Sequence, residues 1–158
     1  MTSAPQPAKR RENLRPVLFL LFELALVLFA ARSLDTARIQ NNVFDEPGHI
    51  AAGMELLQYG KYEVDQLHPP LARVLAALPY YAAGARFETP PDSWTRAEDG
   101  ARLLYDETAY WPALRAARSL FTIVALLFLA GFFDVARARL GAAGAIAALA
   151  VASVSPTL

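Results

Sequence analysis

Three long apolar runs interrupt the polar pattern of this 158-residue chain. The run at residues 16–34 has a single charge across its central 15 positions and is long enough to cross the hydrocarbon core of a bilayer. Runs of similar length occupy residues 115–133 and 140–158, and the last of these carries no charge. The pattern predicts three transmembrane helices at these positions, with a short link at 134–139 and a third helix that the end of the chain cuts short.

Basic residues are concentrated beside these runs. Four of the first 15 residues are Lys or Arg, and the link at 134–139 carries two arginines. Because Lys and Arg resist translocation, we expect residues 1–15 to form a cytoplasmic tail and the link to return to the cytoplasm. Residues 35–114 then form one long loop on the periplasmic or external face. A bias toward Ala and Arg over Lys is a minor hint of a GC-rich bacterium. The expected location is the bacterial inner (plasma) membrane.

A basic tail before an apolar run is also the pattern of a cleaved signal peptide. The run is longer than a usual signal core of about 7 to 15 residues, and the sequence after Ala31 is a poor match to a small-x-small cleavage site. A membrane anchor is therefore the better interpretation. A secreted domain behind a cleaved signal is the alternative, which a mature protein still beginning at Met1 would exclude.

Apolar residues recur at helical spacing twice within the external loop. Glu46-Pro47 is followed by Ile50, Met54 and Leu57, which predicts a helix at about 46–59 that ends near Gly60. A second stripe after Pro70 predicts a helix at about 70–82; it consists of Leu71, Val74, Leu75 and Leu78. Both helices are too short to span, and we expect them to lie along the outer membrane surface as amphipathic helices.

Composition narrows the class of protein. Hydrophobic residues make up 55% of the chain, and 15 basic side chains balance 15 acidic ones. The charge balance gives no support for a nucleic-acid partner. The absence of Cys excludes disulfide frameworks, thiolate nucleophiles and Cys-ligated metal sites. The expected fold class is all-α, a polytopic integral membrane protein with membrane lipids as neighbours.

Titratable residues gather where the two loop helices begin. Together with neighbouring motifs they form an ordered set: Phe44-Asp45-Glu46, Gly60-Lys61-Tyr62, His68-Pro69-Pro70-Leu71 and Leu78-Pro79. This set resembles the first external loop of the polyprenyl-phosphate-sugar-dependent glycosyltransferases of the GT-C superfamily, specifically their protein O-mannosyltransferase-like and aminoarabinose-transferase-like members. Ser155-Pro156 near the chain end also matches that family. Family members have many more spans, so the resemblance implies that the chain is the N-terminal part of a longer enzyme and is inactive alone.

The resemblance implies a reaction and a set of site residues. A sugar would pass, with inversion, from a polyprenyl-phosphate donor to a hydroxyl of a protein, lipid or glycan acceptor, and a base must take the hydroxyl proton. The family motif places this base at Asp45 and gives Glu46 a supporting catalytic role. Four residues would bind substrate: His49, Asp65, His68 and Arg73. From the residues alone, Asp45 is also a candidate helix N-cap and Arg73 a ligand of bulk lipid headgroups.

Two further alternatives remain open at this level. The same carboxylates and imidazoles are suitable ligands for a divalent cation, although their spacing contains no i, i+4 pair of His ligands. The chain could also be a non-catalytic membrane protein whose external loop docks a partner, with its acids serving as helix caps and solubilising groups.

Overall fold

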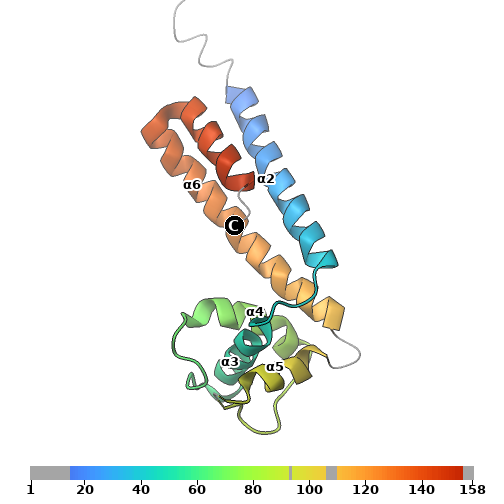
Figure 1. Ribbon diagram of the computed structural model, residues 1–158. Coiled ribbons are helices and arrows are strands. Elements are labelled where there is room, and N and C mark those ends of the chain that lie inside the picture. Colours follow the sequence, from blue (N-terminus) through green and yellow to red (C-terminus); the bar gives the residue numbers. More distant parts are fainter. Residues whose placement is uncertain (1–14, 93, 106–109, 155–158) are drawn as a thin grey trace, which may run out of the picture. The chain divides into compact units, whose positions relative to one another are not determined.

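The computed structural model describes residues 15–92, 94–105 and 110–154 (Figure 1). Within these ranges the regular secondary structure is entirely helical, which confirms the all-α expectation. The helices are α2 (Arg15–Ile39), α3 (Glu46–Tyr59), α4 (Pro70–Ala82), α5 (Arg96–Leu104) and α6 (Tyr110–Val154). Ser155-Pro156 and almost all of the expected cytoplasmic tail lie outside the described residues.

Helices α2 and α6 are long and apolar enough to cross a membrane, over Pro16–Ile39 and Tyr110–Val154. In their most apolar stretches only 6% and 17% of the residues are buried within the structure. The core helix of a soluble protein is instead mostly covered by its neighbours. These two helices therefore support the expectation of a membrane protein with transmembrane helices.

The structure divides into two compact units. We call residues Leu34–Ile123 the loop unit, and the described residues on either side of it the span unit.

In the span unit, α6 reverses at Gly141, whose φ of 73° and ψ of −179° are not helical. This positive φ is accessible to glycine at little cost. Residues 142–154 turn back beside the preceding arm (Figure 1), and Leu149 packs with Leu129 and with Phe29 of α2. The expected link at 134–139 is instead helical, because its Ala and Arg residues favour a helix and the next residue suited to the reversal is Gly141.

In the loop unit, α3 is the central helix and packs against both α4 and α5. Its buried residues Ile50 and Met54 meet Tyr80 of α4 and Leu104 of α5 in one core. Glycines allow these helices to approach closely. A Cβ atom at Gly53 would overlap the Arg73 backbone of α4, and one at Gly100 of α5 would overlap the carbonyl of Pro47.

The loop helices have the expected bounds, but α3 has a different environment from the one expected. Residues 50–55 of α3 are all buried, so the expectation that this helix lies along a membrane surface is wrong. Helix α5 covers one of its sides and lies in a polar stretch where no helix was expected. By contrast, the apolar stripe of α4 faces outward, with Leu71 68% and Leu78 38% exposed. An uncovered apolar stripe of this kind is suited to contact with lipid.

The close crossing at Gly53 predicts that Gly53→Ala destabilises the loop unit by about 1 to 3 kcal/mol, because the added methyl meets backbone that cannot move aside cheaply. Denaturant unfolding in detergent, followed by fluorescence, measures this, since Trp94 and Trp111 both lie in the loop unit. Gly131→Ala is the matched control, because nothing lies within 4 Å of its added Cβ, and it should be neutral or slightly stabilising. Equal unfolding midpoints for the two variants would contradict the packing described.

Candidate functional site

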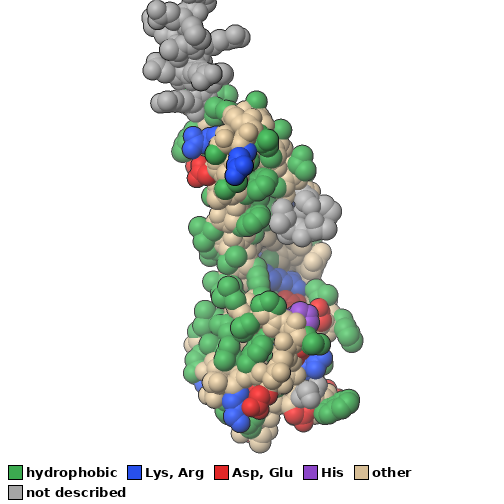
Figure 2. Space-filling model, turned by 90° about the vertical axis from the view of Figure 1, so that its left-hand side faces the viewer, with side chains coloured by type: hydrophobic (Ala, Val, Ile, Leu, Met, Phe, Trp, Pro, Cys, Tyr) green, Lys and Arg blue, Asp and Glu red, His purple; other side chains and the backbone are tan. Residues whose placement is uncertain are grey.

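A pocket of about 430 Å³ opens in the loop unit, where the start of α3 meets the start of α4. Its lining residues are Val43, Asp45, Glu46, His49, His68, Pro69, Ala72, Arg73, Ala76 and Phe121. Five of the six residues expected from the sequence to form a site are among them. The sixth, Asp65, is not a lining residue but contacts two of the five, His68 and Arg73. Figure 2 shows a histidine gathered with acidic and basic side chains on this unit, beside hydrophobic ones.

Asp45 immediately precedes α3, in the position of an N-cap. Its side chain nevertheless makes no capping hydrogen bond within the described residues, so the geometry does not support the capping alternative. The carboxylate is 68% exposed, and its Oδ2 lies 3.5 Å from Nε2 of His49, one turn along the helix. Asp45 therefore presents an accessible carboxylate next to an imidazole.

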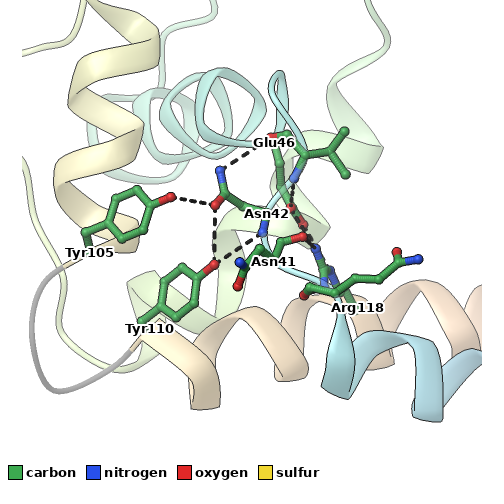
Figure 3. A network of polar contacts seen from close by, with 8 residues as sticks. Asn41, Asn42, Glu46, Tyr105, Tyr110 and Arg118 are labelled. Carbon is green, nitrogen blue, oxygen red and sulfur yellow. Dashed lines mark hydrogen bonds and ion pairs between the residues drawn. The ribbon is translucent and has the colours of Figure 1, made fainter.

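Glu46 is held in a network with Arg118 of α6 (Figure 3). Arg118 approaches both carboxylate oxygens, with Nη2 3.0 Å from Oε2 and Nε 3.3 Å from Oε1. The same guanidinium donates to the carbonyls of Gln40 at 2.7 Å and Asn41 at 2.9 Å. Glu46 also accepts the N–H of Val43 at 3.0 Å. Glu46 is therefore not a free acid. Together with Arg118 it forms a clamp that fixes the segment leading into Asp45.

Two stacked tyrosines hold the same segment through Asn42 (Figure 3). The Tyr105 hydroxyl donates to Oδ1 of Asn42 at 2.6 Å, and the Asn42 N–H donates to the Tyr110 hydroxyl at 3.2 Å. Tyr110 and Arg118 therefore direct their polar groups to residues 40–46, which offer them backbone and side-chain hydrogen-bonding partners.

Arg73 is almost fully buried, at 2% exposure, and is paired inside the unit. Its Nη2 lies 2.6 Å from Oδ2 of Asp65 and 2.8 Å from Nδ1 of His68, and its Nη1 donates to the Asp65 carbonyl. The substrate-binding role expected for Arg73 stays a prediction, since its Nη1 and Nη2 are engaged within the protein. The guanidinium has its charge partner within the protein and positions His68.

Asp65 is the counterion of that arginine. Burial by itself would raise the pKa of Asp65, but the hydrogen bond from the Leu67 N–H and the adjacent Arg73 guanidinium outweigh it and hold the pKa below its usual range. Asp65 therefore stays ionised as a structural partner, and because its Oδ2 is already engaged by Arg73 it is poorly placed to take a proton from a substrate.

Packing of α3 against α4 brings the two histidines of the chain together. The rings of His49 and His68 meet edge to face, with centroids 5.3 Å apart. In the described part of the chain, no group of three His, Asp or Glu side chains has the arrangement to hold a metal ion.

Glu55 is a supporting residue that sequence reasoning missed. It is buried in α3, and its Oε2 accepts the N–H groups of Glu63 at 3.0 Å and Val64 at 3.1 Å. These bonds fix the turn that leads to Asp65. Helical periodicity gave no signal for this role, because Glu55 lies away from the predicted stripe of Ile50, Met54 and Leu57.

Comparisons of the chain with models of protein families, with curated proteins and with solved structures find no match.

The clamp predicts that Arg118→Gln destabilises the loop unit by about 1 to 3 kcal/mol, because two carbonyls and the Glu46 carboxylate lose their donor. A double-mutant cycle with Glu46→Gln should give a coupling of about 1 kcal/mol or more, measured by unfolding in detergent. The exposed Arg115, which lies over the Trp111 ring, provides the control: Arg115→Gln should cost less than about 1 kcal/mol. Additive effects of the two clamp variants would argue against the pair.

The Asp65–Arg73 pair predicts an acid-dependent stability. Because the folded-state pKa of Asp65 lies below the ordinary value of 3.8, its stabilising contribution is complete above that value and is lost as the pH falls through the folded-state pKa. The difference in free energy of unfolding between the native chain and Asp65→Asn, which we call the stability gap, should thus shrink below about pH 4. Unfolding titrations at a series of pH values measure it, with exposed Glu63→Gln as the control. A gap independent of pH would contradict the assignment.

Proposed function

We propose that this chain is the N-terminal part of a GT-C-type membrane glycosyltransferase, which transfers a sugar from a polyprenyl-phosphate donor to an acceptor hydroxyl on the external face. The observation that carries the proposal is the accessible Asp45 carboxylate, which has no capping bond within the described residues and lines a pocket together with His49 and His68. An ordinary N-cap would have its carboxylate engaged by the helix. The family resemblance of residues 44–79 supplies the reaction class.

In the proposed reaction Asp45 is the general base. The acceptor oxygen attacks the anomeric carbon, its proton passes to the Asp45 carboxylate, and the bond to the polyprenyl phosphate breaks on the opposite face, which inverts the configuration. The Glu46–Arg118 clamp contributes a fixed backbone for this base, so Glu46 assists catalysis by positioning.

The proposal includes a topology of three spans with a cytoplasmic N-terminus and an external loop unit. The reversal at Gly141 supports it, because a turn there gives α6 two antiparallel arms in the span unit. The loop unit then faces the side of the bilayer from which nucleotide sugars are absent, so a lipid-linked donor is needed. The outward stripe of α4 is suited to the lipid surface that such a donor occupies.

Replacing Asp45 by Asn tests the function, because Asn keeps the size and capping capacity of Asp but cannot accept the proton. The assay measures sugar transfer from polyprenyl-phosphate donors in membranes of cells that express the complete reading frame containing this chain. We expect a loss of about 10²-fold or more at equal protein level. The exposed Glu63→Gln, outside the pocket, should keep native transfer.

Unchanged transfer in Asp45→Asn would remove Asp45 as the base. Absence of transfer from any donor in native membranes, with Asp45→Asn cells keeping a normal phenotype, would favour the partner-docking function instead.

A further inference from the structure

The contacts of His68 fix the position of its ring proton. Arg73 Nη2 lies 2.8 Å from Nδ1 of His68, and a guanidinium can only donate hydrogen bonds. Nδ1 must therefore be the acceptor, which leaves the proton of a neutral imidazole on Nε2. Asp65 does not compete for Nδ1, because its Oδ2 is 3.8 Å away and already accepts from Arg73.

The backbone around His68 restricts the ring further. Pro69 follows it directly, and the Tyr62 hydroxyl donates to the His68 carbonyl at 2.7 Å. His68 lies two residues before the first residue of α4, and its side chain lines the pocket. Because this ring lines the pocket and its Nδ1 is engaged with Arg73, Nε2–H is the ring group that a bound ligand could use.

The charges that line the pocket make it unsuitable for an anion. Arg73 is neutralised by Asp65, and the Glu46 carboxylate is neutralised by Arg118. Asp45 remains as the carboxylate without an Arg or Lys partner among the lining residues. A phosphate placed here would meet a like charge, and the lining residues include no Arg or Lys without a carboxylate partner to offset it, which is unfavourable in a partly enclosed site.

We propose that this pocket is a subsite for a neutral hydroxyl group, which donates its proton to Asp45 and accepts a hydrogen bond from the His68 Nε2–H. Apolar side chains complete the lining, and Ala72 and Phe121 suit the C–H face of a sugar ring or an alkyl chain. The proposal rests on the proposed function and assigns this site to the hydroxyl-bearing substrate. The donor phosphate is then bound by groups outside this pocket.

Nitrogen NMR of the full chain in nanodiscs tests the proton position directly. The chain contains only two histidines, so ¹⁵N-His labelling gives two imidazoles, and a His49→Gln sample assigns them. At pH 7.5 we expect His68 to show a protonated Nε2 and an unprotonated Nδ1. An Nδ1–H tautomer or a fully protonated ring would overturn the proposal. The measurement uses the native chain, so it does not depend on whether a variant of buried Arg73 folds.

Ligand binding tests the preference for a neutral hydroxyl. Hexyl β-D-glucoside and hexyl phosphate share one alkyl chain, and each is titrated against the labelled chain. Hexyl glucoside should shift the His68 Nε2 signal saturably, and hexyl phosphate should require at least about tenfold higher concentration, the equivalent of roughly 1.4 kcal/mol. A stronger response to hexyl phosphate, or no response to either probe, would overturn the proposal.

A matched pair of variants then isolates the N–H donor, with His49 signals as the readout. His68→Gln carries an amide N–H near the Nε2 position and should keep most of the glucoside affinity, whereas His68→Leu should lose about fivefold or more. Equal affinities would overturn the donor role. None of these measurements involves turnover, so glucoside binding without sugar transfer would retain this subsite while removing the proposed enzyme function.

Discussion

The close packing of α3 against both of its neighbours is the constraint on which the loop unit depends. Two glycines make it possible, Gly53 at the crossing with α4 and Gly100 at the crossing with α5, since a methyl group at either position would overlap backbone. The approach of α3 to α4 brings the His49 ring within 5.3 Å of the His68 ring, although the two residues are remote in the sequence. The pocket is a consequence of this helix packing, because its walls come from both helix starts.

Two arginines organise the polar side of the unit by similar means. Arg118 neutralises Glu46 and ties down the carbonyls that precede it, and Arg73 neutralises Asp65 and orients His68. A guanidinium suits this task because its donors are fixed in a plane and it stays charged when partly buried. Because both cations have internal partners, the Asp45 carboxylate dominates the charge of the pocket.

The apolar pattern was sufficient to predict the long apolar helices and two of the three loop helices. Long runs with few charges predict spanning helices whatever lies around them, and the spacing after Pro47 and after Pro70 predicts α3 and α4 with the bounds observed. The pattern failed where position in space matters. It could not predict α5, whose Arg96–Leu104 sequence is mostly polar, or the burial of α3, because periodicity shows that a helix has an apolar face but not what covers it.

For the candidate site, too, some features follow from the sequence and others depend on position in space. The sequence by itself indicated Asp45, His49 and His68 as candidate site residues, because they lie where the two loop helices begin. Only the tertiary structure decided the surroundings of the candidate residues. Asp45 is accessible, whereas Arg73 is buried and committed to Asp65, because hydrogen-bond partners and desolvation depend on neighbours in space. The spacing of residues along the chain contains no such information.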